Sequence, residues 1–236
     1  MPAGASVPDR APLTFAAPLT LRRSGASFPI PHRSATPGKD WLSALLLAAL
    51  LHVAPAAAAG FEACLQHFPH RAVPQLALAP SLQLRPLCFD AFAVLHSGAS
   101  KTPVYAVARL NARDFENVPR RSRGRNPFYE EARLPAAERA RLADYKARRP
   151  DGSRMDRGHV VPAGDMTTAT GFAQSFSLAN MVPQVPSMNQ GPWNRIEQDT
   201  RRYVQRARGD VYVFTGPIFG PAPERLGPGG VWIPQA

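Results

Sequence analysis

The chain has 236 residues, of which 44% are hydrophobic and 19% are charged, with 28 Lys and Arg against 17 Asp and Glu. This length and composition suit one domain or a tight pair, and they exclude a multi-span membrane protein, a collagen, a coiled coil and a disulfide-dense miniprotein. The formal charge of +11 favours a polyanionic partner, because clustered positive side chains concentrate phosphates over a surface.

Residues 1–59 are predicted to be an N-terminal extension and signal peptide rather than part of the fold. The first 40 residues are rich in Pro, Ser and Arg and show no sustained apolar period, so they cannot bury enough surface to offset the entropy of ordering. A short apolar run over 41–53 follows, with basic residues before it and small residues over 56–60 after it. This pattern is typical of a cleaved secretory signal, which predicts a secreted or periplasmic protein without stable membrane association after cleavage. An uncleaved anchor and a mitochondrial presequence are the alternatives.

Residues 60–236 are predicted to form a single domain, because a chain of this length can bury a core of its own. Its two cysteines, Cys64 and Cys88, are the only ones in the sequence. Export to an oxidising compartment favours a disulfide between them, and the alternative is a pair of buried free thiols.

The expected elements of this domain include two strands and two helices. The segment Pro103–Leu110 is rich in Val and Tyr and predicts a strand. A short helix is expected over Pro135–Ala147, and a longer one begins near Pro192 and is closed by Gly209. A second strand, 209–219, is broken by the Gly-Pro pair at 216–217. These elements predict an α+β fold.

Two side chains that flank a glycine are suited to phosphate binding and ester hydrolysis. If the segment is extended, Arg157 and His159 project from one face about 7 Å apart, with Gly158 between them. A histidine near its ordinary pKa can take a proton from water at neutral pH, as hydrolysis of an ester requires. The other histidines after residue 60 are interpreted as structural, and so is Asp156, which could also pair with Arg157.

Polar residues at the start of the second predicted helix suit a hard cation. The carboxamide oxygen of Asn189 is a donor that Mg²⁺ accepts, although this residue could instead be a helix N-cap. Glu197 lies eight residues later, roughly 12 Å along a helix axis, so we expect it to act through water around the cation or through hydrogen bonds. The alternative for Glu197 is an ordinary helix-surface residue or a partner for Arg201. Met188 and Trp193 are expected in the core.

These motifs together resemble the DNA/RNA non-specific endonuclease family, the sugar-non-specific ββα-metal nucleases. The resemblance covers about 104–233 and rests on several ordered motifs: Asp156-Arg157-Gly158-His159, the segment 180–184, Asn189-Gln190-Gly191 and the segment 193–197. It implies a central antiparallel sheet flanked by helices, and a Mg²⁺-dependent hydrolase, with Mn²⁺ as a substitute, that cleaves DNA and RNA with little sequence preference.

The resemblance also implies roles for single residues. His159 matches the general base, Asn189 the direct metal ligand, and Glu197 the carboxylate that orients metal-bound water. The remaining matches are a phosphate-binding arginine, an asparagine that supports the site, a further arginine beside an asparagine, and an Asp-Tyr pair: Arg157, Asn180, Arg125 with Asn126, and Asp144-Tyr145.

The chain departs from the family pattern in one respect. Members of the family usually continue past the segment that ends here at 231–234, so we expect a fold shortened at the C-terminus. The alternatives to an active enzyme are a catalytically inactive nucleic-acid-binding protein and a truncated nuclease fragment. The sequence lacks the short motifs of serine hydrolases, zinc peptidases and phosphate-loop enzymes.

Overall fold

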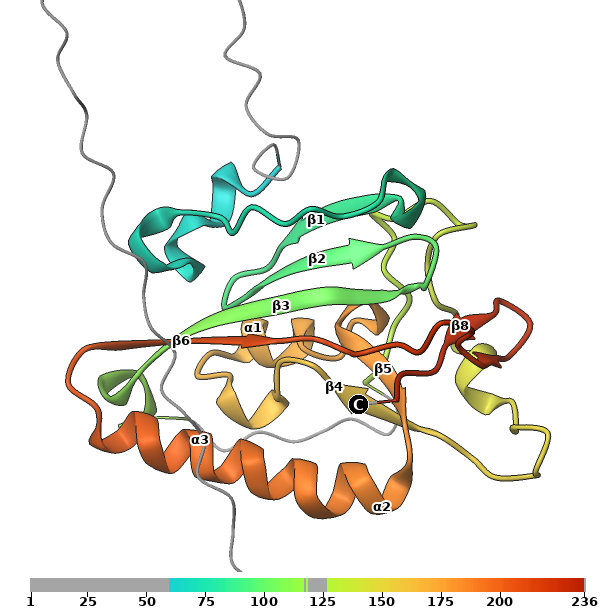
Figure 1. The fold of residues 1–236 in the computed structure, drawn as a ribbon. Helices are drawn as coiled ribbons and strands as arrows, with labels where there is room; N and C mark the ends of the chain where they lie inside the picture. The colour runs from blue at the N-terminus through green and yellow to red at the C-terminus, as the bar shows by residue number, and fades with distance from the viewer. Residues whose placement is uncertain (1–59, 117, 119–126, 236) are drawn as a thin grey trace, which may run out of the picture. The chain divides into compact units, whose positions relative to one another are not determined.

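A computed structural model describes residues 60–116, 118 and 127–235, which combine an antiparallel sheet with one long helical segment (Figure 1). The main sheet has four antiparallel strands in the order β1-β2-β3-β6. Their bounds are Leu84–Cys88, Ala93–Ser97, Thr102–Asn111 and Asp210–Thr215. The predicted strand over 103–110 is thus confirmed within β3, whereas the one over 209–219 ends at Thr215, just before the Gly-Pro pair.

Both faces of this sheet are buried. Successive side chains of a strand point to opposite faces, so Val94 and Ala106 pack in one cluster while Leu95 and Val107 pack in the other. The second cluster also contains Cys64, which is bonded to Cys88 in the predicted disulfide. The sheet therefore lies at the centre of the core, with one hydrophobic cluster on each of its faces.

A smaller sheet leads into the long helical segment. β4 (Asp156–His159) pairs antiparallel with β5 (Met181–Gln184), and the short helix α1 (Ala169–Gln174) lies between them in the chain. After β5 come α2 (Pro186–Met188), a π-helical turn over 189–193 and α3 (Asn194–Arg206). A third small sheet pairs β7 (Arg225–Leu226) with β8 (Val231–Trp232). Within the described ranges, no helix is both long and apolar enough to span a membrane.

The helical segment begins six residues earlier than predicted. Pro186 takes the first helical position, where its fixed φ and missing N–H are tolerated. Pro192 lies inside the segment, where it cannot donate the usual helical hydrogen bond, and the backbone adopts a π turn at that point. Of the helix side chains, only Val204 in α3 is buried, whereas Met188, expected in the core, is 38% exposed.

The helix expected over Pro135–Ala147 is wrong. This stretch consists of turns and a single 3-10 turn, Asp144–Lys146. The fully buried carboxylate of Asp144 accepts hydrogen bonds from the backbone N–H of Arg141 and from that of Gly229, at 2.8 Å and 2.5 Å. A side chain that competes for backbone donors in this way disfavours a continuous helix.

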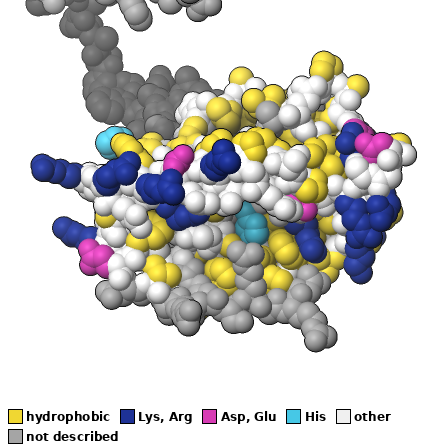
Figure 2. Space-filling view, turned by 90° about the horizontal axis from the view of Figure 1, so that it is seen from below, with side chains coloured by type: hydrophobic (Ala, Val, Ile, Leu, Met, Phe, Trp, Pro, Cys, Tyr) yellow, Lys and Arg dark blue, Asp and Glu magenta, His cyan; other side chains and the backbone are white. Residues whose placement is uncertain are grey.

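The described surface is basic on the side of α3. Figure 2 shows Lys and Arg side chains at both margins of this face, with hydrophobic side chains between them and few acidic ones. Several arginines elsewhere are occupied by carboxylates, as in the ion pairs Arg85–Glu138 and Arg149–Glu224. The basic balance of the sequence is therefore only partly neutralised by internal pairs.

Candidate active site

Strand β4 places Arg157 and His159 on one face, as the two-residue period predicts. The guanidinium carbon of Arg157 lies 4.0 Å from the centre of the Phe128 ring, and the His159 ring lies 5.9 Å from the same centre. Phe176 meets the His159 ring edge-on, with centroids 5.1 Å apart. Two aromatic rings thus restrict the orientation of the imidazole.

Asn180 braces the backbone that follows His159. Its side chain is fully buried, and its Oδ1 accepts a hydrogen bond from the N–H of Val161 at 2.9 Å. Its Nδ2 donates to the carbonyl oxygens of Val161 and Ser175, at 2.9 and 3.0 Å. The backbone carbonyl of Asn180 also accepts from the N–H of Val160. Asn180 therefore holds the end of β4, which agrees with the supporting position that the resemblance implies.

Asn189 lies in the π turn with helical backbone angles, φ −59° and ψ −48°, so it is not an N-cap. Its Nδ2 donates to Oδ2 of Asp156 at 2.9 Å, and Nε2 of Gln190 donates to the same oxygen at the same distance. Asp156, which the sequence indicates as structural, thus links β4 to the start of the helical segment. Arg157, which could have paired with Asp156, instead stacks on Phe128.

His159, Asn189 and Glu197 line one pocket. Its volume is about 260 Å³, and the rest of its lining comes from the segment after β4 and from the helical segment: Pro162, Ala163, Gly164, Gln190 and Asn194. The three residues come from three elements that are separated by up to 38 positions in the sequence. Arg157 is not in this lining, although it shares the contact with Phe128 with His159.

The carboxyl group of Glu197 is tuned by its surroundings. Burial raises its pKa to about 7, and the nearby carboxylate of Asp165 acts in the same direction, while Arg201 and the indole of Trp193 act against it. Arg201 forms its ion pair with Asp165, at 2.7 Å, rather than with Glu197. Near neutral pH the carboxyl group therefore lies close to its protonation midpoint, and a cation in the pocket would favour the charged form.

The donor atoms around this pocket fit a hard cation that keeps most of its water. Among the described residues there is no group of three or more His, Cys, Asp or Glu that could hold a metal. Carboxamide and carboxylate oxygens, such as those of Asn189 and Glu197, are donors that Mg²⁺ accepts alongside several waters. Because the nitrogen of Asn189 is held by Asp156, its oxygen is the polar atom left to meet a cation.

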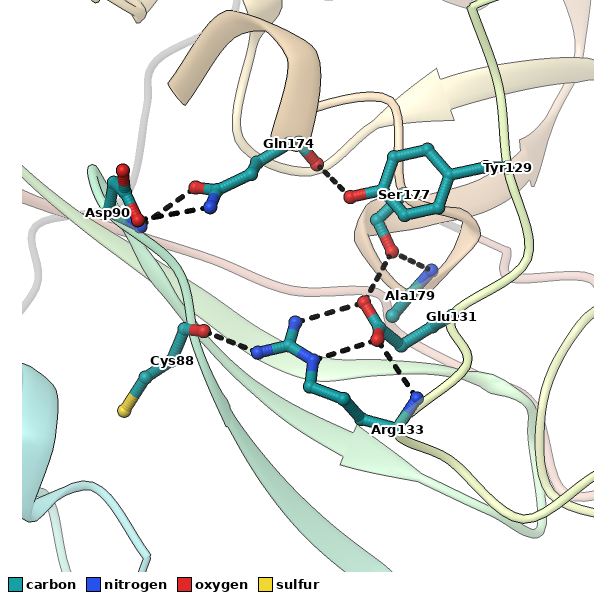
Figure 3. Close-up of polar contacts among 8 residues, drawn as sticks. All are labelled: Cys88, Asp90, Tyr129, Glu131, Arg133, Gln174, Ser177 and Ala179. Carbon is teal, nitrogen blue, oxygen red and sulfur yellow. Dashed lines mark hydrogen bonds and ion pairs between the residues drawn. The ribbon is translucent and has the colours of Figure 1, made fainter. Parts of the chain in front are cut away.

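One predicted residue lies outside the part of the chain that the structure describes, and one network in the region was not predicted. Arg125, the second predicted arginine, lies outside the described residues, as do its neighbours over 119–126. A hydrogen-bond network around the buried side chain of Glu131 was not predicted (Figure 3). Glu131 accepts hydrogen bonds from Nε and Nη2 of Arg133 and from the hydroxyl of Ser177, while Nη1 of Arg133 donates to the carbonyl of Cys88 at 2.6 Å.

This network connects the end of β1 to the turn that contains Asn180. The hydroxyl of Ser177 donates to Glu131 at 3.0 Å and accepts from the N–H of Ala179 (Figure 3). Burial would raise the pKa of Glu131, but the hydrogen bonds from Arg133 outweigh it and hold the pKa below its usual value. The only sequence signal is a Glu and an Arg two positions apart, which is too common to indicate such a network.

Comparison with known proteins identifies relatives. Residues 75–236 match the family described as DNA/RNA non-specific endonuclease. The chain is 33% identical over 134 residues to Nuclease C1 of Cunninghamella echinulata var. echinulata, covering 56% of this chain and 51% of that protein. It is 39% identical over 101 residues to mitochondrial endonuclease G of Bos taurus, covering 42% of this chain and 32% of that protein. It thus spans about half or less of the length of these relatives.

A solved structure shares the fold. The crystal structure described as the EndoG/EndoGI complex, on the mechanism of EndoG inhibition, matches with a TM-score of 0.56 and 22% sequence identity, over 68% of this chain and 71% of that one. The family match extends over more than half of the 236 residues and includes every described residue of the pocket. The chain therefore belongs to the DNA/RNA non-specific endonuclease family.

Proposed function

We propose that this protein is a Mg²⁺-dependent endonuclease, with Mn²⁺ as a possible substitute, that hydrolyses phosphodiester bonds of DNA and RNA without sequence preference. The observation that carries the proposal is the shared pocket of His159, Asn189 and Glu197. The antiparallel pair β4–β5 followed by the helical segment supports assignment to the ββα-metal type of nuclease.

His159 is the general base in this proposal. Its ring is fixed by Phe128 and Phe176 at the end of β4, and it lines the pocket where the water and the phosphate would meet. An imidazole takes a proton from the attacking water at neutral pH. Arg157 contributes a guanidinium that is preorganised by the Phe128 ring, and its planar fork can meet two phosphate oxygens. Arg125 is proposed as a second phosphate contact.

Asn189 would hold the cation through its carboxamide oxygen, and Glu197 would orient the water around it. Bound Mg²⁺ supplies positive charge that stabilises the phosphate and the leaving oxygen. Asn180 keeps the end of β4 in place through its three side-chain hydrogen bonds, which fixes His159 relative to the helical segment.

Nucleic acid would be bound through its phosphates rather than its bases. The pocket is lined by a histidine, amides and a carboxylate, and the surrounding face is basic (Figure 2). Contacts to the phosphate backbone position a strand without reading its sequence, and they make affinity strongly dependent on salt. DNA and RNA are therefore both proposed as substrates.

Plasmid DNA and RNA, each incubated with the purified protein in Mg²⁺ and in EDTA, test this proposal. We expect cleavage of both in Mg²⁺ and none in EDTA. The His159→Ala variant should lose cleavage while binding DNA almost as well as the parent protein, and His70→Ala, at an exposed histidine outside the pocket, is the matched control. A folded parent protein that fails to cleave either substrate, whichever divalent cation is supplied, would instead be an inactive binding protein or a nuclease fragment.

Export from the cytoplasm is part of the proposal. The disulfide between Cys64 and Cys88 supports it, because such bonds persist in oxidising compartments. Fractionation of producing cells should place the protein, lacking about the first 59 residues, in the periplasm or the medium. Full-length protein confined to the membrane fraction would favour an uncleaved anchor, and protein in mitochondria would favour the presequence alternative.

A further inference from the structure

One carboxylate joins the strand of the proposed base to the residue proposed to hold the cation. Asp156 is the first residue of β4, three positions before His159. Its Oδ2 accepts hydrogen bonds from the carboxamide nitrogens of both Asn189 and Gln190, each at 2.9 Å. The mechanism proposed above gives this carboxylate no role.

The chemistry of these groups fixes which way the Asn189 carboxamide faces. An ionised carboxylate only accepts hydrogen bonds, so it selects the NH₂ side of an amide and turns the oxygen away. A carboxamide without such a partner can rotate to present either its nitrogen or its oxygen. The hydrogen bond from Asn189 to Asp156 therefore selects the rotamer whose oxygen faces away from β4.

The local backbone makes this contact possible. Asn189 begins the π turn that accommodates Pro192, and such insertions in helices recur at functional sites. The same turn brings the neighbouring carboxamide of Gln190 to the same oxygen of Asp156. Both amides line the pocket shared with His159, so their orientation bears directly on what the pocket presents to a cation.

We propose that Asp156 is a positioning residue, whose carboxylate orients the Asn189 carboxamide so that its oxygen meets the divalent cation at a fixed place relative to His159. This inference rests on the proposed function, since it assumes that Asn189 holds the cation. Groups that orient metal ligands by hydrogen bonding commonly change metal affinity 10- to 100-fold when they are removed.

Mn²⁺ binding without substrate, followed by the electron paramagnetic resonance signal of free Mn²⁺, tests the proposal independently of cleavage. We expect Asp156→Ala to raise the Mn²⁺ dissociation constant about tenfold or more. Asp156→Asn keeps the volume and one acceptor oxygen but no longer enforces the amide orientation, so we expect about a threefold increase. Asp151→Ala is the matched control, because it removes an exposed aspartate outside the pocket, whose carboxylate accepts from the N–H of Ser153, and it should change the constant less than twofold.

Cleavage kinetics separate positioning from a purely structural role. In Asp156→Ala the Mg²⁺ concentration for half-maximal cleavage should rise in parallel with the Mn²⁺ constant, while kcat at saturating Mg²⁺ should stay within about threefold of the parent value. Either folded Asp156 variant with Mn²⁺ affinity within twofold of the parent would overturn the inference, and Asp156→Asn decides the question if Asp156→Ala does not fold. A parent protein that neither binds Mn²⁺ nor cleaves would overturn the proposed function itself.

Discussion

Replacement of Asn180 by alanine should destabilise the fold more than any other single change near the pocket. The side chain satisfies three backbone groups: the N–H and the carbonyl of Val161 and the carbonyl of Ser175. Asn180 and Ser175 are fully buried and Val161 is 3% exposed, so water does not readily replace the lost partners. A buried polar group left unpaired costs about 1–3 kcal/mol, and the three groups together predict a loss of about 4 kcal/mol.

Urea unfolding followed by circular dichroism measures this loss. With an m-value of about 2 kcal/mol/M, the midpoint for Asn180→Ala should fall by about 2 M relative to the parent. The control is Asn111→Ala. Asn111 is a half-buried asparagine that caps a 3-10 turn by accepting a hydrogen bond from the N–H of Arg113 at 3.1 Å, and its replacement should cost about 1 kcal/mol. If Asn180→Ala unfolded within 1 kcal/mol of the parent, the assignment of Asn180 as the brace of β4 would be wrong.

Three further predictions concern stability. Burial lowers the pKa of His96 to about 4, so as the pH falls the unfolded chain takes up a proton before the folded protein does. This histidine should therefore reduce stability by about 2 kcal/mol between neutral pH and pH 5, and urea unfolding of His96→Gln should lack that contribution. Replacing Cys64 and Cys88 together by alanine removes a cross-link between residues 24 apart and should cost about 3 kcal/mol, measured by urea unfolding against the parent with and without reductant. Gly158→Ala should cost about 1–3 kcal/mol in the same assay, because a Cβ there would lie 2.9 Å from that of Gln184 in the neighbouring strand β5.

The controls for these predictions come from the same chain. Reductant should lower the stability of the parent protein but leave the double cysteine variant unchanged, and equal sensitivity of both would show that another effect is being measured. Gly191→Ala adds a Cβ with nothing within 4 Å, in the helical segment, so it should be neutral or stabilising. A pH dependence that is the same in His96→Gln and in the parent would remove His96 as its source.

Local sequence patterns were sufficient where the structure depends on neighbouring residues. The Val- and Tyr-rich segment over 103–110 is a strand because β-branched and aromatic side chains suit a sheet that is covered on both faces. The alternation of a strand also placed Arg157 and His159 on one face, which their shared contact with Phe128 confirms. The disulfide was predicted from the oxidising compartment expected for the protein, not from any geometry.

Patterns failed where distant residues decide the structure. The stretch 135–147 reads as a helix locally, but the Asp144 carboxylate binds the N–H of Gly229, 85 positions away. Either Pro186 or Pro192 could begin the second helix by its local pattern, and the structure begins the helical segment at Pro186 and contains Pro192 within the π turn. The contact between Asn189 and Asp156 spans 33 positions, so no local spacing indicates it. The roles assigned to the site residues stay predictions until they are tested.

The buried hydrogen bonds that join Glu131, Ser177 and Ala179 have a consequence for local opening of the molecule. Segments joined by buried hydrogen bonds exchange their amide protons as one cooperative unit rather than separately. The amides of Ala179 and Val161, which depend on the hydroxyl of Ser177 and the side chain of Asn180, should therefore exchange with deuterium as slowly as those in the central sheet. The backbone around Val161 and Ala179 would then stay hydrogen-bonded during fluctuations that fray the ends of the helical segment.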